Sequence, residues 1–340
     1  MINIAIVGCG YWGPNIIRNF NSLKDCKVKT ICDLSEERLA HMKTLYPAAE
    51  TTKDYEQLIN DPEIHAIAIA TPVHAHFKLA EKSLNAGKHT LIEKPMAASV
   101  AECVKLKALA EKKKLTLMVG HTFLYSQPVR RIKEIISGGD LGKTLYYISA
   151  RRLNLGLFQK DINVAWDLAP HDISIILYVM DAVPVSVNCQ GNANVNEGIE
   201  DITNMTINFD NNRFATIKSS WLDPNKIREM TFVGSKRMLV YNDLEPNEKV
   251  KIYDKRVEKP PHYDTFGDFQ HSYHYGDMYS PYIKQDEPLK IECQHFLDCI
   301  KSGDMPLTGA AESLRVVQIL EAASESLRNG GNKVMIEKKY

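Results

Sequence analysis

At 340 residues the chain is long for a single domain, and about two domains are expected. Its 42 basic and 42 acidic side chains leave a formal net charge of +0, which excludes the bulk basic field that nucleic acids or anionic membranes require. Seven cysteines without a Cys-x-x-Cys pair favour a reducing compartment over a disulfide framework or a zinc site. No apolar run approaches the roughly 20 residues that span a bilayer, and the first residues read as a strand rather than a signal peptide. We therefore expect a cytoplasmic protein with neither a membrane partner nor a metal.

Residues 1–121 alternate short apolar runs with stretches of helical composition. The runs are nearly continuous, which indicates parallel strands buried on both faces, and the alternation predicts a doubly wound α/β domain. Ser35 and Ser99 are expected to cap helix starts, and Gly87 to end a helix. The predicted strands are Ile2–Val7, Val28–Cys32, Ala66–Ala70, Thr90–Ile92 and Thr116–Val119, and the predicted helices are Asn15–Leu23, Ser35–Tyr46, Ala75–Ala86 and Ser99–Lys112.

Residues 122–340 follow a different pattern, in which alternating strands joined by short turns indicate an antiparallel sheet and therefore a second, α+β domain. One helix is expected after Trp166. Two late helices, Ile291–Lys301 and Ala311–Leu327, close the chain and are candidates to pack back on the first domain. The predicted strands are Thr203–Phe209, Phe214–Ser220, Arg228–Val233, Arg237–Tyr241 and Lys249–Tyr253, with hairpin turns at Asp210–Arg213 and Gly234-Ser235.

A glycine-rich loop, Gly8-Cys9-Gly10-Tyr11-Trp12-Gly13, connects the first strand to the first helix. Glycines at this spacing permit a tight turn and a close approach of a pyrophosphate, and the helix N-terminus offers N–H groups to the phosphates. Asp33 ends the second strand, where a carboxylate accepts the ribose hydroxyls of NAD and repels the extra phosphate of NADP, so NAD is the expected cofactor. Arg38 lies one turn further on and would weaken the preference for NAD over NADP if it faces the ribose. The alternative is a structural turn with Asp33 as a helix cap.

The segment Thr71-Pro72-Val73-His74-Ala75-His76 follows another strand of the same sheet. Ligands of open parallel sheets bind beyond the carboxyl ends of the strands, so Thr71 and Pro72 are expected beside the nicotinamide or its ribose. His74 and His76 are expected to cap the helix or line the cofactor, because a third metal ligand is not found nearby in the sequence.

Glu93-Lys94-Pro95 stands where a further strand leaves the sheet. An ammonium group at this place can orient a substrate hydroxyl and promote its ionisation as hydride leaves, and Glu93 can hold the lysine. Both residues are therefore also expected near the cofactor. The alternative, a surface salt bridge, would contribute about 0–1 kcal/mol.

Asp167 and His171 are four residues apart around Pro170, a residue suited to the first turn of a helix. The spacing places the carboxylate and the imidazole on one side of a helix start. An imidazole of ordinary pKa near 6.5 is suited to accept a hydroxyl proton at neutral pH, and Asp167 can orient it or bind a substrate hydroxyl. The alternative is an N-cap and a packing histidine.

These motifs together resemble the glucose–fructose oxidoreductase/inositol dehydrogenase/MocA (Gfo/Idh/MocA) family over the whole chain. The resemblance implies a Rossmann domain followed by a domain with a large open, mainly antiparallel sheet. It also implies NAD(P) as cofactor, hydride transfer at a carbohydrate or polyol carbinol, and Lys94, Asp167 and His171 as the catalytic set. Members often form homo-oligomers through the open sheet face, so a dimer or tetramer is expected.

One segment departs from the family pattern, because Gly120-His121-Thr122-Phe123-Leu124-Tyr125 stands where many members carry Arg-Phe. The substrates of the inositol and glucose enzymes therefore cannot be assigned to this chain. The segments 166–172, 220–224 and 276–281 look more like the branch that acts on nucleotide-linked sugars. The residues expected to contact substrate are His121, Tyr125, Arg152, Trp166, Asp167, His171 and Tyr279.

The segment from His262 to Tyr282 is rich in His and Tyr, which suits either stacking on a sugar or uracil or an interface. A metal site among His262, His271 and His274 matches no zinc spacing.

The sequence thus predicts an NAD-dependent dehydrogenase that acts on a secondary hydroxyl of a sugar, with a UDP-hexose or its uronic acid, oxidised at C3, as the expected substrate. Two alternatives stay open: an inositol or free-polyol dehydrogenase, and a non-catalytic NAD-sensing regulatory protein that keeps the fold.

Overall fold

The computed structural model describes residues 1–156, 158–159, 161–258 and 272–337. The chain divides into two compact units, which are described separately. Unit 1 comprises Met1–Tyr125 and Asp286–Glu321, and unit 2 comprises Ser126–Gln285 and the described residues from Ala322 onward.

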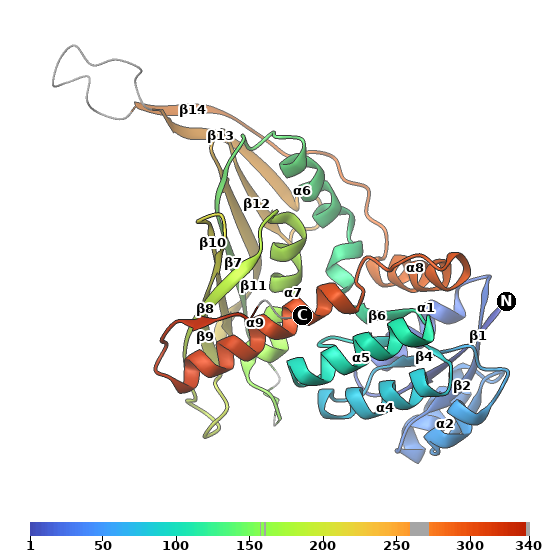
Figure 1. The fold of residues 1–340 in the computed structure, drawn as a ribbon. Coiled ribbons are helices and arrows are strands. Elements are labelled where there is room, and N and C mark those ends of the chain that lie inside the picture. The colour runs from blue at the N-terminus through green and yellow to red at the C-terminus, as the bar shows by residue number, and fades with distance from the viewer. Residues whose placement is uncertain (157, 160, 259–271, 338–340) are drawn as a thin grey trace, which may run out of the picture. The chain divides into compact units, whose positions relative to one another are not determined.

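Unit 1 contains a parallel sheet with the strand order β3-β2-β1-β4-β5-β6 (Figure 1). β2 and β3 are added on one side of β1, and β4, β5 and β6 on the other. This order is that of a dinucleotide-binding domain and confirms the predicted doubly wound fold. The short strand β3 was not predicted. The strands are β1 Ile2–Val7, β2 Cys26–Cys32, β3 Glu50–Thr52, β4 Ala66–Ile69, β5 His89–Glu93 and β6 Leu117–Gly120.

Two helices of unit 1, α2 and α5, begin at serines that cap their backbone amides. Ser35 accepts a hydrogen bond from the Arg38 amide and Ser99 from the Glu102 amide, so both predicted N-caps are confirmed. Gly87, at φ 77°, ends the fourth helix as predicted. The helices are α1 Gly13–Asn21, α2 Glu36–Leu45, α3 Tyr55–Asn60, α4 Val73–Asn85, α5 Val100–Lys113, the 3₁₀ turn η1 Thr122–Tyr125 and α8 Pro288–Ser302.

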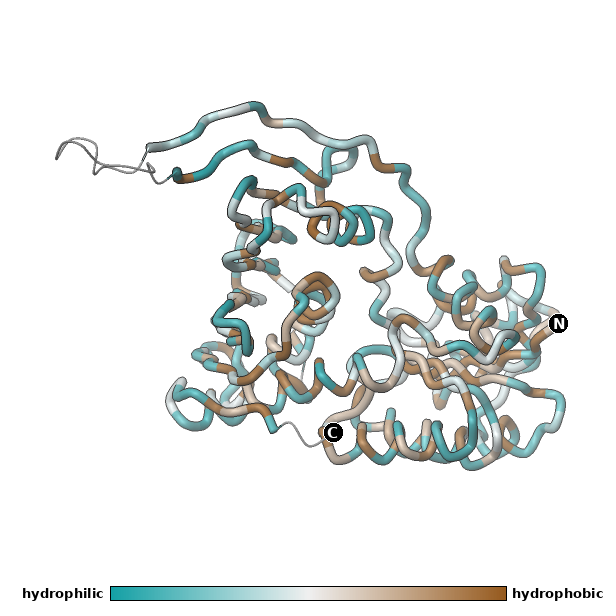
Figure 2. The backbone as a smooth tube through the Cα atoms, turned by 45° about the horizontal axis from the view of Figure 1, so that its top comes forward, coloured by the Kyte–Doolittle hydropathy of each residue, from teal (hydrophilic) through white to brown (hydrophobic). Residues whose placement is uncertain are grey.

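The core of unit 1 lies between its sheet and helices from both ends of the sequence. Ile4 and Ile6 of β1 are fully buried, and Phe20 of α1 packs edge-on against Phe296 of α8 at 6.3 Å between ring centroids. The apolar residues follow the strands, whereas polar and apolar residues alternate along the helices (Figure 2).

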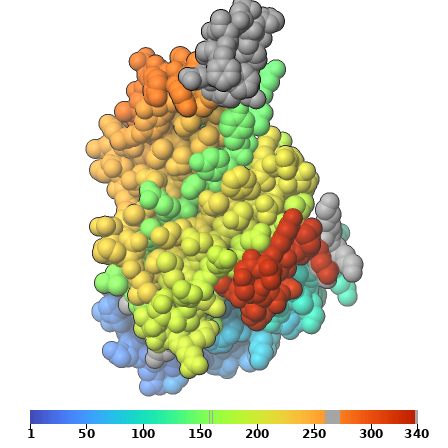
Figure 3. All heavy atoms as spheres, turned by 90° about the vertical axis from the view of Figure 1, so that its left-hand side faces the viewer, coloured from blue at the N-terminus to red at the C-terminus, as the bar shows by residue number. Residues whose placement is uncertain are grey.

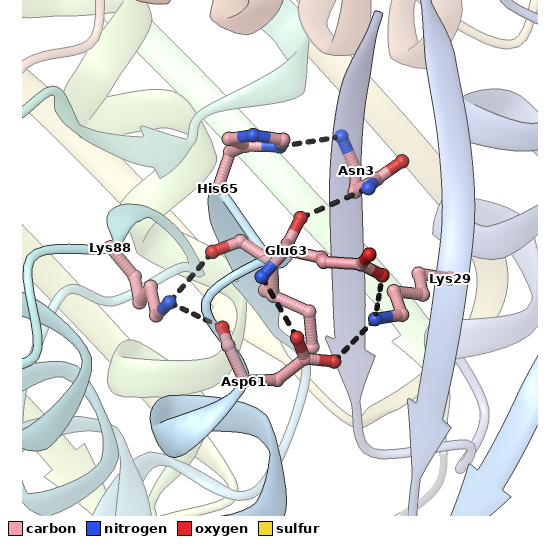
Figure 4. A network of polar contacts seen from close by, with 7 residues as sticks. Asn3, Lys29, Asp61, Glu63, His65 and Lys88 are labelled. Carbon is pink, nitrogen blue, oxygen red and sulfur yellow. Dashed lines mark hydrogen bonds and ion pairs between the residues drawn. The ribbon is translucent and has the colours of Figure 1, made fainter.

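A polar network ties the segment before β4 to β2 and β5, at the amino ends of the strands (Figure 4). The ammonium group of Lys29 lies 2.6 Å from both the Asp61 and the Glu63 carboxylates. Lys88, almost fully buried, donates to the backbone carbonyls of Asp61 and Ile64. The network lies at the sheet edge opposite the glycine loop, so we assign it to stability.

Unit 2 is built on a sheet with the strand order β14-β13-β12-β11-β7-β10-β9-β8-β15. All neighbours are antiparallel except β7 and β10, which confirms the predicted mainly antiparallel sheet and its hairpins β9–β10 and β11–β12. The strands are β7 Leu145–Leu155, β8 Pro184–Asn192, β9 Ile202–Phe209, β10 Phe214–Ser220, β11 Leu222–Gly234, β12 Met238–Asn242, β13 Val250–Glu258, β14 Ser272–Tyr279 and β15 Val334–Met335, of which β7, β8, β14 and β15 were not predicted.

Helix α7, Val164–Val179, packs on one face of this sheet, against β7, β9 and β10. The space-filling view of Figure 3 shows one face of the molecule on which residues of unit 2, coloured yellow to orange, lie next to one another. The other helices are α6, Gln127–Ser137, and α9, Ala310–Arg328, which begins in unit 1 and ends in unit 2. Among the residues described, no helix has both the length and the apolarity needed to cross a bilayer.

The position of Pro170 in α7 corrects a prediction. The helix begins at Val164, where Asn163 caps the Trp166 amide, so Pro170 lies inside the helix rather than in its first turn. Proline favours a first turn because it has no N–H to donate, and this preference misled the assignment. Asp167 still lies in the first turn, and His171 follows one turn later.

Candidate active site

The glycine loop of unit 1 has the shape that a dinucleotide pyrophosphate requires. Gly8 has a φ of 95°, and a Cβ atom at Gly13 would lie 1.9 Å from the Gly8 carbonyl oxygen, so neither position accepts a side chain. Helix α1 follows directly, and its N-cap residue Trp12 makes no side-chain capping bond. The amides at this helix start are thus not covered by a cap, which fits an anion at this place.

Asp33 is fixed at the end of β2 by two backbone amides. One carboxylate oxygen accepts from the Cys9 amide at 2.6 Å, and the other accepts from the Ser35 amide at 2.8 Å. The Arg38 guanidinium lies 3.9 Å from the same carboxylate and is more than half exposed. The site therefore presents a rigidly held carboxylate to a ribose, with one cation beside it, and these residues fit NAD.

The two histidines after β4 differ in their surroundings. His74 is exposed, whereas His76 is almost fully buried, with Nδ1 2.8 Å from the Pro95 carbonyl oxygen and Nε2 2.8 Å from that of Thr71. His76 thus joins the loops that follow β4 and β5. The Thr71 hydroxyl oxygen, buried and without a hydrogen-bond partner in the described chain, is a polar group that a cofactor can satisfy.

Glu93 and Lys94 stand at the carboxyl end of β5. The Glu93 carboxylate accepts from the Lys94 amide at 3.3 Å and lies against Gly120, where a Cβ atom would come within 3.0 Å of it. Burial raises the pKa of Glu93 to about 7, while the Lys94 charge and the Trp12 indole act in the opposite direction. The glycine loop, through Trp12, and the end of β5 therefore converge in one unit.

His121 and Tyr125, both expected to contact substrate, are buried in unit 1. Burial, and secondarily the charge of Lys94, lowers the pKa of His121 to about 4, so its imidazole is neutral. Neither ring nitrogen of His121 has a hydrogen-bond partner in the described residues. Tyr125 is fully buried, and its hydroxyl lies 3.0 Å from that of Thr308, so Tyr125 belongs to the core.

In unit 2, Asp167 is held by a residue of the segment 220–224 that was not among the predicted site residues. The indole N–H of Trp221 donates to Asp167 Oδ2 at 3.1 Å. Trp221 is 1% exposed and packs against the Phe158 ring, so its orientation is fixed. His171 lies one helical turn from Asp167 on the same side of α7, and both side chains are partly exposed.

Arg152, expected to contact substrate, forms a buried ion pair instead. Its Nε and Nη2 donate to the two carboxylate oxygens of Asp172 at 3.0 and 2.8 Å, and the side chains are 6% and 2% exposed. Asp172 directly follows His171 in α7. The pair therefore links the helix that carries Asp167 and His171 to the central strand β7.

The remaining predicted positions lie elsewhere in unit 2. The Trp166 indole donates to the Ser324 hydroxyl at 2.8 Å, and Tyr279 is 43% exposed on β14. His274 Nε2 lies 3.1 Å from the Asp254 carboxylate. His262 and His271 lie outside the described residues. No group of three or more His, Cys, Asp or Glu side chains in the described part could hold a metal ion.

Comparison with known proteins connects both units to one family. Residues 2–121 match the family profile described as oxidoreductase family, NAD-binding Rossmann fold, and residues 129–240 match the GFO/IDH/MocA C-terminal domain. The scyllo-inositol 2-dehydrogenase (NAD(+)) of Bacillus subtilis is 24% identical, with 97% of this chain and 95% of that protein covered.

Solved structures show the same fold. UDP-N-acetylglucosamine 3-dehydrogenase from Acidithiobacillus ferrooxidans superposes with a TM-score of 0.79 at 22% identity, covering 97% of this chain and 99% of that chain. An oxidoreductase from Agrobacterium radiobacter in complex with NAD+ superposes with a TM-score of 0.81 at 19% identity, covering 98% of both chains.

Proposed function

Because the chain belongs to the GFO/IDH/MocA family of NAD-binding oxidoreductases, we propose that it oxidises a secondary hydroxyl of a nucleotide-linked sugar. The observation that carries the proposal is the convergence, in unit 1, of the glycine loop and Asp33 with Lys94 at the end of β5. A passive nucleotide binder has no need of a lysine at that place. When bound, NAD supplies the hydride acceptor.

In the proposed reaction the residues of the chain orient the carbinol and take its proton. Lys94 donates a hydrogen bond to the substrate hydroxyl and favours its ionisation. His171 accepts the hydroxyl proton, and Asp167, fixed by Trp221, orients the imidazole or a neighbouring hydroxyl. With NAD held by the glycine loop and Asp33, the carbinol would be oxidised to a carbonyl, and its hydroxyl proton would remain on His171. We propose that the three residues act on one carbinol.

Two observations favour a nucleotide-linked substrate such as a UDP-hexose or its uronate. The segments 166–172, 220–224 and 276–281 resemble the branch that acts on nucleotide-linked sugars, and the chain shares its fold with a UDP-N-acetylglucosamine 3-dehydrogenase. An inositol or free-polyol substrate is the second candidate, because the inositol dehydrogenase of Bacillus subtilis aligns along nearly the whole chain. An NAD sensor would not need Lys94, Asp167 and His171 together.

The test is NADH formation on a panel of UDP- and dTDP-sugars, free sugars, myo-inositol and other polyols. We expect turnover with a nucleotide sugar, with the Lys94→Ala protein as a control for contaminating activity. Turnover of myo-inositol or glucose alone would select the second candidate. Binding of NAD without turnover of any carbohydrate would contradict both and favour the sensor.

We further propose that a second copy of the chain covers the outer face of the unit 2 sheet. Large apolar side chains on its strands are exposed, among them Leu155 and Phe214. Light scattering should then give a dimer or tetramer, and a monomer at micromolar concentration would contradict the proposal. All seven cysteines are buried and free, in keeping with a reducing, cytoplasmic location.

A further inference from the structure

His76 lies in unit 1 between the two loops that carry Thr71 and Lys94. It is the fourth residue of α4 and is 1% exposed. Its Nδ1 lies 2.8 Å from the carbonyl oxygen of Pro95, the residue after Lys94, and its Nε2 lies 2.8 Å from the carbonyl oxygen of Thr71. One side chain thus contacts both the backbone that leaves β4 and the backbone that leaves β5.

The backbone around Lys94 is held on both sides of this residue. On the side of β5, the Glu93 carboxylate accepts a hydrogen bond from the Lys94 amide at 3.3 Å. On the other side, the Pro95 carbonyl meets the His76 ring, and residues 96 and 97, which follow it, are fully buried. His76 therefore ties the segment after Lys94 to α4, and loss of this contact would let the Lys94 backbone shift.

The second contact of the ring fixes Thr71 at the end of β4. Thr71 precedes Pro72, the N-cap residue of α4, which makes no side-chain capping bond. The Thr71 hydroxyl is buried and has no hydrogen-bond partner among the residues described, so a bound molecule is needed to satisfy it. In an open parallel sheet a cofactor binds beyond the strand end where this hydroxyl lies.

The protonation of the ring decides which carbonyl it bonds, because a carbonyl oxygen accepts a hydrogen bond only from an N–H group. Burial lowers the pKa of His76, the two carbonyls act in the opposite direction, and the charges of Lys94 and His74 add to the effect of burial. The ring is therefore neutral at pH 7 and carries one N–H. Its two tautomers present this N–H to Pro95 and to Thr71 in turn.

We propose that His76 is a positioning residue for two groups at once. Through Pro95 it holds Lys94 in place, and through the Thr71 backbone it holds the hydroxyl that contacts bound NAD. Because the ring is almost fully buried, it acts through these residues rather than on the reacting atoms. The effect on NAD affinity needs only an NAD-binding fold, whereas the effect on turnover rests on the proposed function.

Two variants of the full chain separate the two contacts, because each keeps one donor of the ring. The amide nitrogen of Asn takes the place of Nδ1 and can donate to Pro95, whereas that of Gln takes the place of Nε2 and can donate to Thr71. His76→Asn should weaken NAD binding about three- to tenfold in calorimetry and keep kcat. His76→Gln should keep the NAD affinity and lower kcat about tenfold. Lys78→Gln, an exposed change on the same helix, should alter neither quantity.

A purely structural role of His76 would not produce this crossed pattern. A less stable fold reduces the amount of active enzyme in both variants, and it leaves the NAD affinity of the folded molecules unchanged. Equal effects in the two variants, a reversed pattern, or no effect in either would overturn the proposal. If the substrate panel gives no turnover, the proposed function fails, and the NAD affinities of His76→Asn and His76→Gln still decide on the contact with Thr71.

Discussion

The Arg152–Asp172 pair should be a main determinant of the stability of unit 2. Arg152→Met removes two hydrogen bonds between charged groups, at 3.0 and 2.8 Å, and leaves Asp172 buried without its cation. Each such bond contributes about 1.5–3 kcal/mol, and breaking one partner of a buried pair costs about 3–5 kcal/mol. We therefore expect Arg152→Met to lower the free energy of unfolding by about 3–5 kcal/mol.

The assay is urea unfolding followed by tryptophan fluorescence in a Trp12→Phe background, where both remaining tryptophans, Trp166 and Trp221, report on unit 2. The matched control is Arg151→Met, because Arg151 forms an exposed pair with Glu229 and should lose less than about 1 kcal/mol.

Replacement of both partners provides a second check. Arg152→Met combined with Asp172→Leu should recover most of the stability that Arg152→Met loses, because no unpaired charge is left in the core. If Arg152→Met lost no more than the exposed control, the pair would not hold α7 to the sheet, and the reasoning would be refuted.

Three further predictions follow from single contacts. Asp33→Ala should weaken NAD binding by about 1.5–3 kcal/mol in calorimetry, and equal binding of NADP by the wild type would contradict the role of this carboxylate. Trp221→Phe keeps an aromatic ring but removes the hydrogen bond to Asp167, so kcat should fall about five- to tenfold with unchanged NAD affinity. An unchanged kcat would show that this hydrogen bond does not orient Asp167. Burial raises the pKa of Glu292 in the folded chain above its ordinary 4.5. The contribution of this group to the free energy of unfolding is therefore greatest below about pH 4.5 and falls as the pH rises. Glu292→Gln should unfold at a higher urea concentration than the wild type at about pH 8, but not at about pH 4.5.

The sequence predicted unit 1 well because its signals are local. The glycine loop, the apolar strands and the caps at Ser35 and Ser99 are each set by a few neighbouring residues. Strand β7 was missed because its polar side chains, Arg151 and Arg152 among them, interrupt the alternation, and its partners come more than 50 residues later.

The residues that support the candidate site could not be found in the same way. Trp221, which holds Asp167, lies 54 positions from it in the sequence. No periodicity encodes such contacts, because they depend on how distant elements pack. The buried role of Arg152 likewise depends on Asp172, which in the sequence is only one of many acidic residues.

The most direct test of the account is a double-mutant cycle on kcat for Lys94 and His171, measured with the substrate that the panel identifies. If both residues act on one carbinol, each alanine variant should lower kcat by about 10²–10⁴, while the affinity for NAD changes little. Residues that act as one unit are not additive, so the double variant should lose little more than the worse single variant. A His171→Ala enzyme with near-normal kcat, or fully additive losses, would contradict the proposal that Lys94 and His171 act together in proton and hydride transfer.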